Sequence, residues 1–95
     1  MPSTYDVINP ANESIVETVN LLGLEETDAV IAKAAKAFES WKNVAPGERA
    51  RLLRAFSQIV TDHREELAQL EITNSGHTHG NALWEADNVA NTLMY

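Results

Sequence analysis

Cysteine is absent from the 95 residues of the chain. This absence excludes a disulfide framework, a thiolate metal site and a cysteine nucleophile within the sequence. Glycine is also scarce, and its four occurrences follow no strand into a helix at the spacing of a phosphate-binding loop. No Gly-x-Ser-x-Gly motif of serine hydrolases is present. We therefore expect neither catalytic nor cofactor-binding residues within this chain.

Basic residues are few: 7 Lys and Arg stand against 14 Asp and Glu, which gives a formal net charge of −7. A protein that binds nucleic acid needs a Lys/Arg stripe to displace counterions from phosphates, and an anionic membrane surface attracts clusters of basic residues. The composition therefore predicts no nucleic-acid partner and no membrane partner.

Long apolar runs are missing as well. No stretch approaches the roughly 20 apolar residues that cross a bilayer, and residues 1–20 show no basic segment followed by an apolar one, as a secretory signal would. The sequence predicts a cytoplasmic protein.

The patterns that are present predict a mostly α structure, with an N-terminal β-hairpin followed by about four helices. β-forming residues flank the turn-rich segment 9–13, and apolar residues then recur at helical spacing. The predicted helices span about residues 24–42, 47–62, 62–74 and 80–95. Pro46 suits the start of the second helix, Asp62 is predicted to cap the third, and Gly76 is placed to end the third in the left-handed conformation.

Apolar stripes on these helices predict which side chains face inward. The expected inward-facing residues are Ile31, Ala34, Ala35, Phe38, Trp41, Leu52, Leu53, Phe56, Ile59, Val60, Leu67, Leu70, Ile72, Leu83, Ala86, Val89, Ala90 and Leu93. The stripe of the last helix consists mostly of small residues, and its Asn residues and Thr92 are poor helix formers. We therefore predict that residues 81–95 form the least stable element. They also end without a helix-terminating residue, as if the sequence continued.

Few of the titratable residues are arranged in a way that would support metal binding or catalysis. His77 and His79 share a loop, with His63 as a third imidazole, but zinc requires three or four ligands and helical ligand pairs are usually spaced i, i+4. We interpret the two loop histidines as solvated and expect His63 at the edge of a helix stripe. Paired carboxylates such as Glu65 and Glu66 are sequence neighbours on exposed helix faces, which does not create the facing pair that acid–base catalysis requires.

Four motifs occur in the order and spacing of one known family. They are Ile8-Asn9-Pro10-Ala11-Asn12-Glu13-Ser14-Ile15-Val16; Asp28-Ala29-Val30 with Ala35-Lys36-Ala37-Phe38 and Trp41; Pro46-Gly47-Glu48-Arg49-Ala50-Arg51-Leu52-Leu53; and Glu66-Leu67-Ala68-Gln69-Leu70-Glu71 with Asn74-Ser75-Gly76, Glu85, Asp87 and Tyr95. On these motifs the chain resembles the N-terminal segment of aldehyde dehydrogenases over about residues 5–95. His77-Thr78 departs from the Lys-Pro that commonly follows the glycine matched by Gly76.

The resemblance implies an NAD(P)-dependent oxidation of an aldehyde to a carboxylic acid by a full-length enzyme, which we expect to be a homo-oligomer. In the family a Cys thiolate attacks the aldehyde, hydride passes to the nicotinamide, and a Glu-activated water hydrolyses the thioester. Residues 1–95 would then be the N-terminal part of the NAD(P)-binding domain, a fragment of an α/β fold whose Rossmann-like sheet and catalytic domain lie outside them. Their role would be that of a scaffold.

Many members of the family also hold a monovalent cation. The resemblance places its ligands here at the backbone carbonyls of Val7 and Ile8 and at the side chain of Glu85, where the family more often has Asp. A different reading of the whole chain also stays open, because its apolar stripes are equally compatible with a self-standing helical interaction module that has no catalytic activity.

Overall fold

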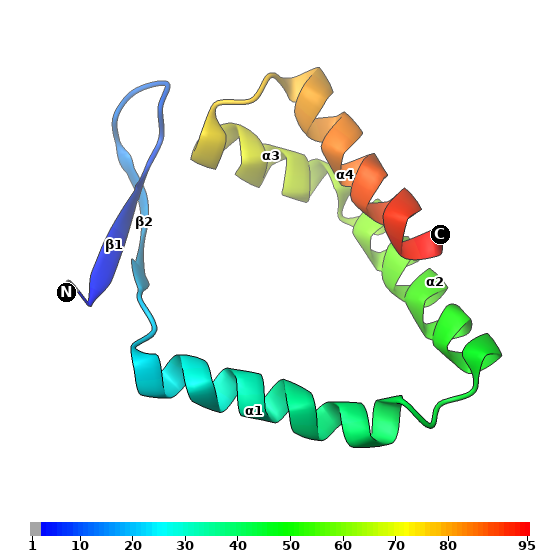
Figure 1. Cartoon of the computed structure of the whole chain (residues 1–95). Helices are drawn as coiled ribbons and strands as arrows, with labels where there is room; N and C mark the ends of the chain where they lie inside the picture. Colours follow the sequence, from blue (N-terminus) through cyan, green and yellow to red (C-terminus); the bar gives the residue numbers. More distant parts are fainter. Residues whose placement is uncertain (1–2) are drawn as a thin grey trace.

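The computed structural model describes residues 3–95, and in it a two-stranded hairpin is followed by four helices (Figure 1). The elements are β1 (Thr4–Ile8), β2 (Ile15–Asn20), α1 (Leu24–Trp41), α2 (Pro46–Asp62), α3 (Arg64–Ser75) and α4 (His79–Met94). This order and these bounds confirm the predicted hairpin and the four predicted helices.

The hairpin turn is closed by local hydrogen bonds. The Asn9 backbone N–H donates to the Ser14 carbonyl at 2.8 Å, and the Asn9 side-chain oxygen accepts from the Ala11 N–H at 2.9 Å. Asparagine side chains favour turns because they can make such bonds to the backbone two residues on. The antiparallel register is irregular between Val7 and Ile8, immediately before this turn.

Local signals place the helix starts. The Gly23 N–H donates to the Glu26 carboxylate at 3.0 Å at the start of α1, and Pro46 occupies the first turn of α2, where its missing N–H costs nothing. The Thr78 hydroxyl caps α4 by accepting from the Asn81 N–H.

The predicted cap at Asp62 is wrong. Asp62 is the last residue of α2, and its carboxylate accepts a hydrogen bond from the Gln58 side chain at 2.9 Å. His63 separates α2 from α3 and makes no side-chain cap bond to α3. Because helix α2 uses Asp62 for its own final turn, that side chain cannot also turn back onto the first turn of α3.

The buried core lies where α4 packs against α2 and α3. It consists of small side chains, led by Ala68 of α3, which is fully buried, and it also contains the polar residue Ser57. The Ser57 hydroxyl donates to the Ala90 carbonyl at 2.7 Å, which satisfies this buried group and ties α2 to α4. The buried side chains are Ser57, Val60, Ala68, Ala82, Ala86 and Ala90.

Most of the predicted inward-facing side chains are exposed, and for them the prediction is wrong. Helix α1 has no buried residue, and Phe38 and Phe56 are each 56% exposed. The molecule measures 48 × 37 × 15 Å, and its 15 Å thickness accommodates little more than one helix of 10–12 Å diameter. With no second layer over the helices, their large apolar side chains have nothing to pack against.

The open arrangement is also visible in the radius of gyration, which is 17.3 Å. A compact domain of this length has a radius of gyration of about 12 Å. In Figure 1, α1 and the strands of the hairpin lie apart from the cluster formed by α2, α3 and α4, and the hairpin turn approaches the α3 end of that cluster. Among residues 3–95, no helix is both long enough and apolar enough to span a membrane.

The hairpin turn approaches the helical cluster at Gly76. As predicted, Gly76 ends α3 in the left-handed conformation, with φ of 76°. A Cβ atom at this position would lie 2.9 Å from Cγ of Pro10 in the hairpin turn. A residue with a side chain would therefore be strained and would also push the hairpin away. The hairpin turn thus lies against the α3–α4 connection.

Candidate functional site

Three side chains with metal-ligating and acid–base potential meet at the end of the α3–α4 pair. His77 Nε2 lies 3.5 Å from Glu71 Oε1 and 3.5 Å from Glu85 Oε1. Glu71 comes from α3, His77 from the connection and Glu85 from α4. Within residues 3–95, this is the group of His and carboxylate side chains whose ligand atoms come close enough together to hold a metal ion.

The backbone explains how these residues meet. Because Gly76 adopts the left-handed conformation, the chain turns sharply after α3 and places His77 beside the last turns of that helix. The Ser75 hydroxyl lies 2.9 Å from Glu71 Oε1, the same oxygen that faces His77. Sequence reasoning missed this group, since it interpreted His77 as solvated. The only sequence signal was a glycine that reverses the chain between a Glu and a His.

The predicted monovalent cation ligands are distributed between two elements. Val7 and Ile8 lie in β1 at the irregular step of the hairpin, whereas Glu85 lies on α4. Within residues 3–95, the Glu85 carboxylate lies 3.5 Å from the His77 imidazole, and no hydrogen bond links Glu85 to β1. The contact between Pro10 and Gly76 nevertheless brings the hairpin turn to the loop that leads into α4.

The other two histidines have separate partners, so the three imidazoles do not meet. His63 Nδ1 lies 2.8 Å from the Ile59 carbonyl, within one helical turn. His79 Nε2 lies 3.2 Å from Glu65 Oε2, and both of these side chains are exposed.

A bidentate ion pair also joins α3 to α4. Arg64 Nε and an Arg64 terminal nitrogen donate to the two Asp87 carboxylate oxygens at 2.6 and 2.9 Å. These hydrogen bonds hold the pKa of the Asp87 carboxyl below its ordinary value of 3.8, and the positive charge of Arg64 lowers it further. Parallel bonds of this kind fix orientation as well as distance, so the pair sets how the two helices align.

The lowered pKa of Asp87 predicts an acid-dependent loss of stability. The stabilisation is fully present above the carboxyl's unfolded-state pKa, and it is lost as pH falls through the lower folded-state pKa. Thermal unfolding of the wild-type protein and of Asp87→Asn should therefore show a gap at pH 7 that closes at pH values below 3.8. Glu48→Gln, which removes the exposed i, i+3 pair with Arg51, is the matched control and should show a smaller gap. A gap for Asp87→Asn that stays constant down to pH 2 would contradict the assignment.

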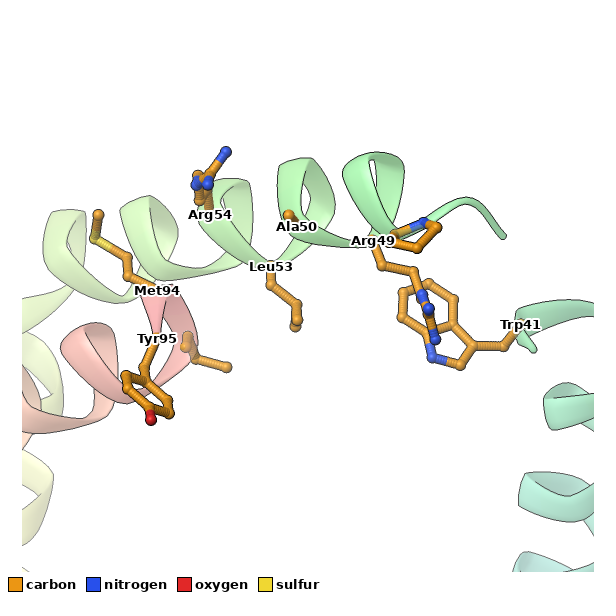
Figure 2. A pocket seen from close by; sticks show the side chains of 9 residues that line it. Trp41, Arg49, Ala50, Leu53, Arg54, Met94 and Tyr95 are labelled. Carbon is orange, nitrogen blue, oxygen red and sulfur yellow. The ribbon is translucent and has the colours of Figure 1, made fainter. Parts of the chain in front are cut away.

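Two apolar grooves lie between the helices. One, of about 380 Å³, lies where α2 approaches the end of α4, and Leu53 points into the space flanked by Trp41 and Tyr95 (Figure 2). The other, of about 390 Å³, is bounded by α2, α3 and α4, and Glu71 and Glu85 are the charged residues among its apolar lining. Both grooves are open surfaces of the kind that a further layer of structure covers.

Comparison with known proteins shows which sequences this chain resembles. A sequence model described as the aldehyde dehydrogenase family matches residues 1–95. A malonate-semialdehyde dehydrogenase of Bacillus subtilis subsp. natto is 40% identical over 80 residues, which are 84% of this chain and 16% of that protein. A mitochondrial succinate-semialdehyde dehydrogenase of Arabidopsis thaliana is 35% identical over 92 residues, which are 97% of this chain and 17% of that protein.

Solved structures show the same arrangement of elements. The crystal structure of betaine aldehyde dehydrogenase from Staphylococcus aureus in complex with NAD+ has a TM-score of 0.92 and 34% sequence identity to this chain, and the match covers 98% of this chain and 19% of that one. The chain thus spans less than a fifth of the length of these relatives. Because the family model matches residues 1–95, the whole of this sequence, the chain belongs to the aldehyde dehydrogenase family.

Proposed function

We propose that residues 1–95 form the N-terminal part of the NAD(P)-binding domain of an aldehyde dehydrogenase, which oxidises an aldehyde to a carboxylic acid. The observation that carries this proposal is the match of 98% of the chain, at a TM-score of 0.92, to an aldehyde dehydrogenase in complex with NAD+. The one-layer architecture supports it too, because exposed apolar faces on α1 and α2 suit helices that cover another layer.

Within that enzyme, the role of this segment is structural. The chain contains no cysteine, so the thiolate that attacks the aldehyde belongs to another part of the enzyme. Gly23 is the one glycine between β2 and α1, and the sequence has no Gly-x-Gly-x-x-Gly to cradle a dinucleotide pyrophosphate, so we assign the segment no contact with the cofactor. NAD or NADP would supply the hydride acceptor, and residues 1–95 would help to hold the domain that binds it.

For the monovalent cation we propose the backbone carbonyls of Val7 and Ile8 together with the side chain of Glu85. The contact of Pro10 with Gly76 supports this assignment, because it holds the hairpin beside the loop before α4. We also propose that the full-length enzyme is a cytoplasmic homo-oligomer with an aldehyde substrate and with no nucleic-acid or membrane partner. The acidic composition supports the last two points.

A second candidate function is a self-standing helical interaction module without catalytic activity. The observation that favours it is the same set of exposed apolar side chains, which a separate partner protein would cover. An isolated 95-residue chain with a sharp, concentration-independent thermal transition and no binding of hydrophobic dyes would support the module.

The two candidate functions predict different activities for the product of the natural gene. The product of the natural gene should reduce NAD+ or NADP+ when it is supplied with semialdehydes or betaine aldehyde. Phe38→Asp should lower this activity by more than about tenfold, since a charge buried beneath a covering layer costs several kcal/mol. Ala29→Asp introduces the same side chain on the exposed face of α1 opposite Phe38, four residues before Lys33, so it should retain activity. A gene product without dehydrogenase activity, or full activity of Phe38→Asp, would contradict the proposal.

A further inference from the structure

We propose that Glu71, His77 and Glu85 form a site for a divalent transition metal of the zinc type. Its ligands would be one imidazole nitrogen and two carboxylate oxygens, and a water molecule would complete the coordination. The site shares Glu85 with the monovalent cation site proposed above and differs from it in its other ligands, which are Glu71 and His77 in place of the hairpin carbonyls.

The distances between the ligand atoms match this coordination. Zinc binds nitrogen and oxygen ligands at about 2.0–2.2 Å in a tetrahedron, which places neighbouring ligand atoms about 3.3 Å apart. His77 Nε2 lies 3.5 Å from each of the two carboxylate oxygens, and all three atoms lie within 4.8 Å of one another. A strong charge-assisted hydrogen bond would be much shorter, about 2.7–2.9 Å. The spacing is therefore closer to an edge of a metal tetrahedron than to a tight ion pair.

The surroundings hold two of the three ligands in place. The Ser75 hydroxyl lies 2.7 Å from the Glu71 carbonyl oxygen and 2.9 Å from Glu71 Oε1, so its one proton is shared between these two acceptors. Its contact with Oε1 limits the rotation of the Glu71 carboxylate, as outer partners of metal-ligating carboxylates do. Gly76 fixes the position of His77, because its left-handed conformation and its contact with Pro10 leave little freedom for the connection.

Within residues 3–95, the site is open to solvent. The three side chains are 35% to 43% exposed, and both carboxylates border the apolar groove between α2, α3 and α4. Two carboxylate groups beside one imidazole also leave excess negative charge, which a dication would neutralise.

The ligand types select the class of metal. An imidazole with two carboxylates suits zinc, cobalt and similar ions, whereas magnesium requires near-octahedral oxygen ligands and usually retains several waters. His79 and Glu65 form a two-residue pair, and two ligands fall short of the three or four that zinc takes from a protein. That pair therefore provides an internal control.

The test is calorimetric titration of the full-length protein with Zn²⁺ in a buffer free of K⁺ and Na⁺, so that no monovalent ion competes for Glu85. We expect one Zn²⁺ per chain, with affinity at least about tenfold weaker in His77→Lys and unchanged in His79→Lys. His77→Lys supplies a cationic partner for both glutamates but has no imidazole to ligate a metal, so it separates metal binding from ion pairing. Circular dichroism of each variant checks that the fold is intact.

Two further measurements decide the outcome. Zn²⁺ should raise the thermal midpoint of the wild-type protein by mass action and should not do so in His77→Lys, while Mg²⁺ should shift neither. Co²⁺ should give the intense visible bands of four-coordinate cobalt in the wild-type protein alone. Absence of one-to-one Zn²⁺ binding, or equal affinity of folded wild-type and His77→Lys proteins, would overturn the proposal.

Discussion

Ala68→Leu should destabilise the chain by about 1–3 kcal/mol, since a larger side chain in a filled interface forces neighbouring atoms out of their rotamers. Ala68 has no exposed surface and lies where α3 packs against α4. Its methyl group allows the two helix backbones to approach closely, and an isobutyl group would have to separate them. For a domain of this size, each kcal/mol lowers the thermal midpoint by about 4–8 °C.

The control for this substitution is Ala55→Leu, which places the same side chain on an exposed position of α2. Surface substitutions of this kind usually change stability by less than about 0.5 kcal/mol. The measurement is thermal or urea unfolding of both variants followed by circular dichroism. Equal midpoints for Ala68→Leu and Ala55→Leu would show that the α3–α4 interface is not a packed core.

Local chemistry made the elements of the fold predictable. Pro46 marks a helix start because its fixed φ suits the first turn, and Gly76 marks a helix end because only glycine adopts the left-handed conformation at little cost. The resemblance to aldehyde dehydrogenases added the arrangement of these elements, which the comparisons confirm. Asp62 was assigned to the wrong helix because its side chain lies between two helices and could bond to either. In the structure it accepts a hydrogen bond from Gln58 of α2.

Burial was much less predictable, because it depends on what the helices pack against. A helical stripe such as Phe38 and Trp41 shows which face is apolar, but it does not show whether that face meets another part of the same 95 residues. In the structure the core consists mainly of small residues of α2, α3 and α4, and most of the large apolar side chains remain exposed. Alanines allow close helix approach, so helices that meet through them leave their bulkier neighbours outside the contact.

The candidate metal site was also not predictable from the sequence alone. Glu85 was singled out through the family resemblance, but its partners Glu71 and His77 were not. Their sequence separations fit no helical ligand spacing, because a left-handed glycine reverses the chain between the two. Only the three-dimensional turn at Gly76 brings the three ligand atoms within 4.8 Å of one another.

Among the four helices, α1 has the least tertiary packing. The sequence predicted α4 to be the least stable element because its apolar stripe is small. In the structure those small residues, Ala82, Ala86 and Ala90, are the buried ones, and the Arg64–Asp87 ion pair holds the same helix. Helix α1 buries no residue and packs on none of the other helices to a comparable extent.

Hydrogen exchange of the isolated 95-residue chain should therefore be fastest in α1 and slowest along the buried face of α4. A helix without tertiary packing opens readily in water, because nucleating it is costly and packing supplies most helical stability in proteins. The amides of α4 around Ala86 should open only when α2 and α3 separate from it, so their exchange should be at least about tenfold slower than exchange around Ala34. Native-state exchange followed by NMR resolves the two helices in one sample, which removes any difference in conditions. Equal protection of α1 and α4 would show that α1 is covered in the isolated chain, either by self-association or by closure of the open arrangement. A dilution series then separates these two causes, because only self-association depends on concentration.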